Sequence, residues 1–279
     1  MTTATQITND LYCLSSAGFA IIPDFLSPET VSSLQKKTEA WIEEVRAYEK
    51  ATSESVGYGS GWPLENIRCL YAIDEAFRAL AMDARLQAYA HSYLGEYEIG
   101  DVQVLSNMPD ERYARLGPQG PVHFHRDHVW QEDQDPPYAL HCFMPLTDMT
   151  RENGATVIVP GSHRTREPNY PFAESEERER ADDNSTSGFR RRLFPSSISL
   201  EAPSGSLVLI DPMAIHSQGN NISETPRTVL NVAFKQRCLR GQLNGHAIAM
   251  NYSRAEVDPD FLKTLVCNDA LPGTYGPLE

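Results

Sequence analysis

The chain has 279 residues and 41% hydrophobic residues, so it can bury a large core and global disorder is excluded. Its 38 acidic residues outnumber its 24 basic residues, and the net charge of −14 opposes a nucleic-acid partner because phosphate contacts need local cations. No apolar run approaches the roughly 20 residues of a membrane span, and residues 1–10 lack the basic and apolar regions of a signal peptide. We therefore expect a cytoplasmic protein with neither a membrane nor a nucleic-acid partner.

The first hundred residues predict helices and one short strand. Residues 18–23 form an apolar run that ends in Pro, which is typical of a strand, and Ser27 followed by Pro28 predicts the start of a helix. Apolar residues recur at helical spacing over residues 31–48, so this amphipathic helix should end near residue 49. A second helix is predicted over residues 75–93.

From residue 100 onward the chain changes to short β-rich runs bounded by Pro, Gly, Asn and Asp. The predicted strands cover residues 101–106, 138–146, 156–160, 206–210 and 227–234. Short strands of this kind predict an antiparallel sandwich or barrel. Residues 164–195 contain 14 charged residues, seven of each sign, and we interpret them as an inserted loop that acts as a lid.

The densest group of candidate metal ligands is the segment Pro121-Val-His-Phe-His-Arg-Asp-His128. Residues i and i+2 of an extended strand point the same way, so His125 and Asp127 present an imidazole and a carboxylate to one side. His216, which follows an apolar strand and a turn at Asp211, is the candidate third ligand. Two histidines and one carboxylate leave three coordination positions open, which suits a non-haem Fe(II) oxygenase better than four-coordinate zinc.

The other histidines are weaker candidates. His123 has the same strand parity as His125 and could replace it in a shifted register, whereas His128 points away. His163 is interpreted as a structural turn residue. His91 and His141 have no motif around them and are interpreted as ordinary polar residues.

Arg227 lies 11 residues after His216 and opens the apolar run Arg-Thr-Val-Leu-Asn-Val-Ala-Phe. A guanidinium beside a metal site is costly without an anion to pair with. A carboxylate that binds in a bidentate manner is its natural partner.

These motifs together resemble the phytanoyl-CoA dioxygenase-like (PhyH) family of Fe(II)/2-oxoglutarate-dependent oxygenases. The resemblance spans about residues 14–240 and rests on the motifs His125-Arg-Asp127, Asn153-Gly-Ala-Thr-Val-Ile-Val-Pro-Gly-Ser-His163, and His216 followed by Asn220, Asn221 and Arg227. Residues 18–29 also look like the opening of that family. The resemblance implies a mainly β fold, with a double-stranded β-helix (jelly-roll) core and flanking helices.

The resemblance also implies roles for individual residues. Three of them would bind Fe(II), namely His125, Asp127 and His216, and Arg227 would anchor the distal carboxylate of 2-oxoglutarate. Thr156 would be a second contact to that carboxylate. Asn107, on the strand before the metal motif, is a further cosubstrate candidate.

The implied activity is that of an oxidoreductase, a dioxygenase that uses Fe(II), 2-oxoglutarate and O2 and releases succinate and CO2. It would hydroxylate, desaturate or cyclise a small organic molecule in natural-product or specialised metabolism. The carboxylate at Asp127 argues against the halogenating variants, which resemble this family but have a small residue there.

Two other functions fit parts of the sequence. Residues 123–128 match HxHxDH, the signature of metallo-β-lactamase-like zinc hydrolases, for which His163 and Asp211 would supply later ligands. The Gly- and Pro-rich residues 117–121 before the motif and the lack of a role for Arg227 argue against this hydrolase. A non-catalytic jelly-roll binding protein would require the three candidate ligands to be accidental.

The candidate ligands and Arg227 must converge, which predicts one catalytic domain over residues 1–279. We expect helical support over about residues 1–99, the jelly-roll core over about 100–240 and a C-terminal extension over 241–279. The expected partner is a small-molecule substrate, and a homodimer is compatible with the sequence.

Overall fold

The computed structural model describes residues 3–52, 64–67, 70–111, 124–127, 136–165 and 196–236. Its helices are α1 (Ala4–Ala17), α2 (Pro28–Thr52), α3 (Leu70–Ile73), α4 (Glu75–Ala81) and α5 (Ala84–Leu94), with a 3-10 turn η1 (Ser162–Arg164). Its strands are β1 (Phe19–Ile22), β2 (Leu64–Ile67), β3 (Tyr97–Asn107), β4 (Ala139–Pro145), β5 (Val157–Ile158), β6 (Ile198–Ser199), β7 (Leu207–Ile210), β8 (His216–Ser217) and β9 (Arg227–Gln236).

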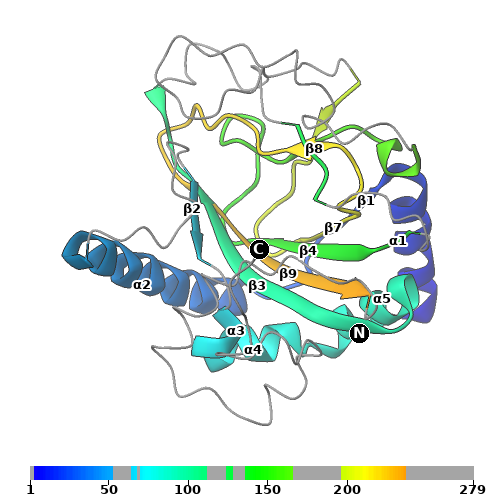
Figure 1. Ribbon diagram of the computed structural model, residues 1–279, viewed down its shortest axis with the longest axis horizontal. Helices are drawn as coiled ribbons and strands as arrows, with labels where there is room; N and C mark the ends of the chain where they lie inside the picture. Colours follow the sequence, from blue (N-terminus) through cyan, green and yellow to red (C-terminus); the bar gives the residue numbers. More distant parts are fainter. Residues whose placement is uncertain are drawn as a thin grey trace, which may run out of the picture.

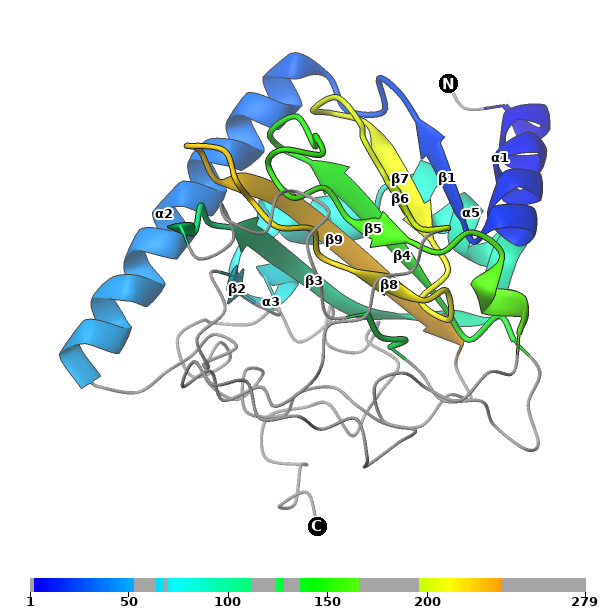
Figure 2. The ribbon, with the colours of Figure 1, turned by 90° about the horizontal axis from the view of Figure 1, so that it is seen from above.

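The strands form two antiparallel sheets. The large sheet has the order β1-β7-β4-β9-β3-β2, and the small sheet has the order β6-β5-β8. Helices α3, α4 and α5 cover one face of the large sheet, and β8 lies on its other side (Figure 1). Seen from above, the small sheet lies across the large one, with α1 beside the edge strand β1 and α2 running past the ends of the strands (Figure 2). This is the jelly-roll core with flanking helices that the sequence predicts.

Side chains of the large sheet alternate between two cores. On β4, Leu140, Cys142 and Met144 belong to the core that includes the helices, whereas Phe143 packs in a second core with residues of the small sheet such as Ile158. Fully burying one such aliphatic side chain contributes about 1.5–3 kcal/mol. The face of the large sheet that looks toward the small sheet, hereafter the inner face, is where a site between the sheets can form.

Most predicted elements are present. The helix that begins after Ser27 is α2, and the five predicted β-rich runs overlap β3, β4, β5, β7 and β9, of which β3 and β9 are longer than predicted. The prediction of a single helix over residues 75–93 is wrong, because the chain breaks at Met82 and Asp83 into α4 and α5. The Asp83 carboxylate accepts a hydrogen bond from the Arg85 backbone N–H at 2.8 Å, which starts a new helix at that point.

Helix α1 is an element that the apolar spacing did not reveal. Thr3 caps it by accepting the Gln6 backbone N–H at 3.2 Å, and Gly18 ends it with a left-handed φ of 86°. The first hundred residues also supply more than helical support, because β1 and β2 are the two edge strands of the large sheet.

Two predicted segments fall largely or wholly outside the described residues. These are the inserted loop, of which only Arg164 and Thr165 are described before residue 196, and the extension over residues 241–279. The lid function of the loop therefore stays a prediction. None of the described helices is long and apolar enough to span a membrane.

Gly154 provides a test of how tightly the Asn153-Gly154 turn is packed. Its φ is +81°, and a Cβ there would lie 2.7 Å from the Gly219 carbonyl oxygen and 3.0 Å from the Asn221 nitrogen. Gly161 is the control, because it is left-handed with a φ of +77° but the nearest atom to a Cβ, the Ser16 carbonyl oxygen, lies 4.0 Å away. We expect Gly161→Ala to cost about 1–2 kcal/mol from backbone strain alone.

Gly154→Ala should cost a further ~1–3 kcal/mol, because backbone atoms cannot move aside as a flexible side chain can. Urea unfolding of the two variants and the wild type measures both costs. Equal losses of stability in the two variants would contradict the packing of this turn.

Candidate metal centre

The His125 and His216 backbones are joined in an antiparallel bridge. The His125 N–H donates to the His216 carbonyl at 2.9 Å, and the His216 N–H donates to the His125 carbonyl at 3.0 Å. On its other side β8 pairs with β5, where Ile158 lies opposite His216. The segment around His125 thereby extends the small sheet and places two candidate ligands side by side.

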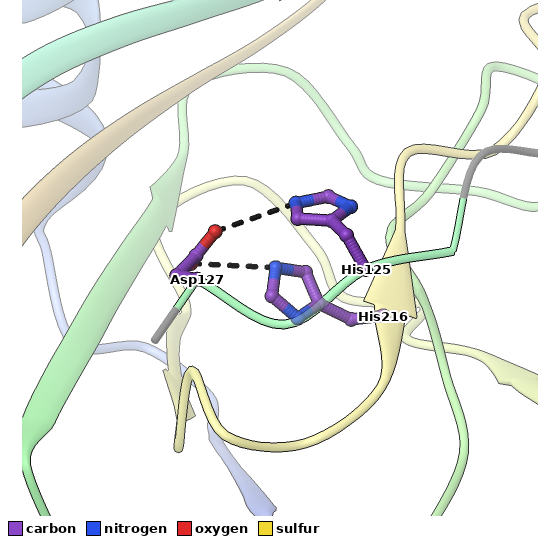
Figure 3. Close-up of side chains that lie close together, drawn as sticks. All are labelled: His125, Asp127 and His216. Atoms are coloured by element: carbon purple, nitrogen blue, oxygen red, sulfur yellow. Dashed lines mark ion pairs between the residues drawn. The ribbon is translucent and has the colours of Figure 1, made fainter. Parts of the chain in front are cut away.

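The three candidate ligand side chains point toward one another (Figure 3). His125 Nε2 lies 3.3 Å from Asp127 Oδ1, and His216 Nε2 lies 3.5 Å from Asp127 Oδ2. One ligand atom from each residue lies within 4.8 Å of the other two. The Asp127 backbone is held by its N–H, which donates to the Pro212 carbonyl at 3.0 Å.

The protonation states in this cluster suit metal binding. A carbonyl can only accept, so His216 Nδ1 donates its proton to the Ala214 carbonyl at 2.8 Å and leaves the Nε2 lone pair for a ligand. Burial lowers the pKa of His216, which favours the neutral imidazole. Burial alone would raise the pKa of Asp127, but the charges of the surrounding imidazoles and a hydrogen bond from His125 lower that pKa well below its usual range. A neutral imidazole and a carboxylate are the forms that bind a cation.

The donor set also fits a single metal ion. Ligands at right angles around a metal, each about 2.1 Å away, are themselves about 3 Å apart. The separations of 3.3 and 3.5 Å are close to that spacing. Two imidazole nitrogens and one carboxylate oxygen form the donor set of non-haem iron sites, which keep open positions for other ligands.

Arg227 is a buried cation at the start of β9. Its side chain is on the inner face, because Val229, two residues on, packs in the core between the sheets. The residue is only 2% exposed, and burial lowers its pKa to about 10, so it still carries a charge at neutral pH. Within the described part of the chain, its guanidinium has no hydrogen bond or ion pair, and its Nε is fully buried without a partner. An unpaired buried charge is costly, so this site fits an anionic group such as the distal carboxylate of 2-oxoglutarate.

Thr156 is buried directly before β5. By strand alternation its side chain faces the same way as Ile158, which packs in the core between the sheets. Thr156 therefore faces the large sheet, as a cosubstrate contact requires. Among the described residues, no hydrogen bond joins its side chain to Arg227.

The geometry of Asn107 favours a structural role. Its Nδ2 donates to the carbonyls of Gly219 at 3.0 Å and Gly154 at 3.4 Å, and its own carbonyl accepts from Asn221 Nδ2 at 2.8 Å. These bonds join the end of β3 to two turns. Its Oδ1 is buried without a partner among the described residues, and this acceptor would repel a carboxylate.

His141 is a site residue that sequence reasoning missed. It was interpreted as an ordinary polar residue, but its Nδ1 lies 3.7 Å from Asp127 Oδ2 and 3.5 Å from Asn231 Nδ2. The alternation of side chains along β4 is the sequence signal that could have placed His141 in the site. Leu140, Cys142 and Met144 face the helices, so a polar residue between them must look into the inner face.

The zinc hydrolase alternative requires His163 and Asp211 as its later metal ligands. His163 Nε2 donates to the Ser15 carbonyl at 3.1 Å, which confirms the expected structural role and ties η1 to α1. Asp211 accepts the Tyr93 hydroxyl at 2.8 Å and the Met213 backbone N–H at 2.8 Å. Both later ligands of the hydrolase are therefore engaged in structural contacts, while His123 and His128 lie outside the described residues.

Comparisons with known proteins identify the family of this chain. Residues 14–229 match the phytanoyl-CoA dioxygenase (PhyH) family. The chain is 28% identical over 237 residues to the ectoine dioxygenase of Halomonas elongata, covering 79% of this chain and 67% of that protein. It is 25% identical over 237 residues to the ectoine dioxygenase of Streptomyces coelicolor, covering 81% of this chain and 76% of that protein.

Two solved structures have the same fold. HygX from Streptomyces hygroscopicus, with nickel, 2-oxoglutarate and hygromycin B bound, is similar with a TM-score of 0.59 at 17% identity, covering 82% of this chain and 86% of that one. The epimerase SnoN, in complex with Fe3+, α-ketoglutarate and nogalamycin RO, is similar with a TM-score of 0.62 at 19% identity, covering 99% of this chain and 94% of that one. With the family match over most of its length, the chain belongs to the phytanoyl-CoA dioxygenase (PhyH) family of iron- and 2-oxoglutarate-dependent dioxygenases.

Proposed function

We propose that this dioxygenase oxidises a C–H bond of a small organic metabolite at an iron held by His125, Asp127 and His216. Arg227 anchors the distal carboxylate of 2-oxoglutarate, and Thr156 is the proposed second contact to it. The observation that carries the proposal is the combination of three ligand atoms within 4.8 Å of one another with a buried cation on the inner face, Arg227, that has no partner among the described residues.

The chain's own residues prepare this site before any cosubstrate arrives. When bound, iron with 2-oxoglutarate and O2 supplies the oxidant for the substrate C–H bond, with succinate and CO2 as products. The Ala214 carbonyl fixes the His216 ring so that Nε2 faces the metal position. Phe143, Ile158 and Val229 form an apolar core between the sheets, which keeps water away from that part of the interior.

The proposed substrate class is a natural product or another specialised metabolite. The similar proteins include ectoine dioxygenases, HygX with bound hygromycin B, SnoN with bound nogalamycin RO and the carbocyclase SnoK. Hydroxylation is the main proposed outcome. Desaturation and cyclisation are kept as alternatives, because the similar structures include an epimerase and a carbocyclase. The net charge of −14 disfavours a polyanionic CoA ester. A homodimer and a cytoplasmic location stay predictions.

The iron ligands can be tested by anaerobic addition of Fe(II) and then 2-oxoglutarate. We expect a visible metal-to-ligand charge-transfer band in the wild type and its loss in His216→Ala, because two ligands cannot hold iron in the same geometry. His91→Ala is the control, since His91 is exposed on α5. A folded wild type without the band, or one that binds zinc tightly and stoichiometrically, would argue against the assignment.

The role of Arg227 can be tested with Arg227→Met, which replaces an unpaired buried charge by an apolar side chain of similar length. We expect stability without cosubstrate to be kept or raised, because the desolvation penalty disappears. With iron present, saturating 2-oxoglutarate at about 100 times its Kd should stabilise the wild type by about 2.7 kcal/mol and the variant by much less. Thermal unfolding with and without 2-oxoglutarate measures this, and Arg151→Met, at an exposed position, is the control. If 2-oxoglutarate stabilised Arg227→Met as much as the wild type, Arg227 would not be part of the cosubstrate site.

The substrate class can be tested by succinate release. We expect compact polar metabolites, aminoglycosides or polycyclic natural products to stimulate 2-oxoglutarate turnover more than an acyl-CoA ester does. Each assay includes a reaction without substrate, because uncoupled turnover also releases succinate. The strongest stimulation by the acyl-CoA ester would overturn the proposed class while leaving the dioxygenase activity intact.

A further inference from the structure

Arg126 lies between two candidate iron ligands in sequence, but its side chain donates hydrogen bonds to residues elsewhere in the chain. Neighbouring residues of an extended segment point to opposite sides, so Arg126 points away from His125 and Asp127. The residue is only 4% exposed. Its Nη1 donates to the carbonyls of Ser162 at 2.9 Å and Met213 at 2.7 Å. A cation is thus buried directly behind the metal-binding segment.

The two carbonyls belong to two other segments of the chain. Ser162 is the first residue of η1, at the end of the Pro-Gly-Ser-His motif, and Met213 lies three residues before His216. Arg126 Nη2 also donates to Thr165 Oγ1 at 3.2 Å, just after η1. One guanidinium therefore joins the segment of His125 and Asp127 both to η1 and to the loop that leads to the third ligand.

Ser162 extends this network to the residue beside His216. Its Oγ accepts the Ile215 backbone N–H at 2.7 Å and donates to the Val159 carbonyl at 2.7 Å. The loop before His216 is consequently held at Met213 by Arg126 and at Ile215 by Ser162. These contacts define the Arg126 clamp, which consists of Arg126, Ser162, Met213 and Ile215.

We propose that Arg126 is a positioning residue, which fixes Asp127 relative to His216 before iron binds. This inference rests on the proposed function of those two side chains as iron ligands. The backbone bridge fixes His125 against His216 directly, whereas Asp127 is held to the loop before His216 by the bond from its N–H to the Pro212 carbonyl. The contact of Arg126 with the neighbouring Met213 carbonyl supports that attachment. Arg suits this role because its planar guanidinium presents several donors in fixed directions, whereas a Lys ammonium on a flexible stem does not.

The clamp predicts a specific loss of iron affinity. Groups that orient metal ligands from behind typically change metal affinity by about 10–100-fold when they are removed. We expect that loss in both Arg126→Met and Arg126→Lys, because Lys keeps the charge but not the geometry. The affinity of the iron-saturated variants for 2-oxoglutarate should stay within about twofold of the wild type, because Arg227 is untouched. Arg164→Lys is the matched control, since Arg164 lies in the same turn but is exposed.

The measurements are anaerobic Fe(II) titration by competition with a chromophoric chelator, 2-oxoglutarate titration at saturating iron, and thermal unfolding of the metal-free proteins. Wild-type iron affinity in Arg126→Lys, with only a lower Tm, would reduce Arg126 to a core residue and overturn the clamp. Equal losses of iron and 2-oxoglutarate affinity would do the same, because they indicate general damage to the site.

A second variant keeps the test decisive if the Arg126 variants do not fold. Ser162→Ala removes the acceptor for the Ile215 N–H and leaves Arg126 in place, so iron affinity should fall several-fold with 2-oxoglutarate affinity retained. Unchanged iron affinity in Ser162→Ala would count against the clamp. A wild type that binds no Fe(II) would instead overturn the proposed function itself, and the outcomes are therefore distinguishable.

Discussion

The antiparallel bridge between His125 and His216 is the constraint on which the site depends. Its two backbone hydrogen bonds make the segment with His125 and Asp127 a neighbour of β8, so strand alternation decides to which side each side chain points. The histidines face the interior between the sheets. Phe124 and Ile215, one residue before each histidine, pack together with Val157 in a small apolar cluster on the opposite side. The hydrophobic cluster and the candidate metal donors thus lie on opposite faces of the same paired backbone segments.

Two buried arginines, Arg126 and Arg227, differ in how their charges are satisfied. Arg126 has its charge solvated by the carbonyl dipoles of Ser162 and Met213, as expected of a group that holds a structure together. Arg227 has no such partner among the described residues, although it is the more deeply buried of the two. The fold gives the Arg126 guanidinium three hydrogen bonds and the Arg227 guanidinium none among the described residues, and this contrast supports the proposal that Arg227 binds an anionic ligand. The net charge of −14 describes the protein surface and hides this local positive charge.

The sequence predicted the parts of this molecule that depend on local patterns. The jelly-roll strands appeared as apolar runs, and the spacing of His125 and Asp127 gave two donors on one side. Arg126 could not be assigned, because its partners are main-chain carbonyls that only the tertiary fold brings close. His141 was overlooked although strand alternation places it on the inner face, and its contact with Asp127 depends on the tertiary fold. The break before α5 was missed for a different reason. Apolar periodicity continues through it, and the competing signal was the capping preference of Asp83.

The two sheets contribute different side chains to the candidate site. The small sheet and the segment paired with it carry the three candidate metal ligands, whereas Arg227 and His141 project from the large sheet. The proposed metal binding and the proposed cosubstrate anchoring therefore depend on different backbone pairings. They are coupled through the packing of Phe143, Val208 and Val229 against residues of the small sheet. We therefore expect substitutions in the shared core to affect both proposed functions together, because residues in contact are energetically coupled.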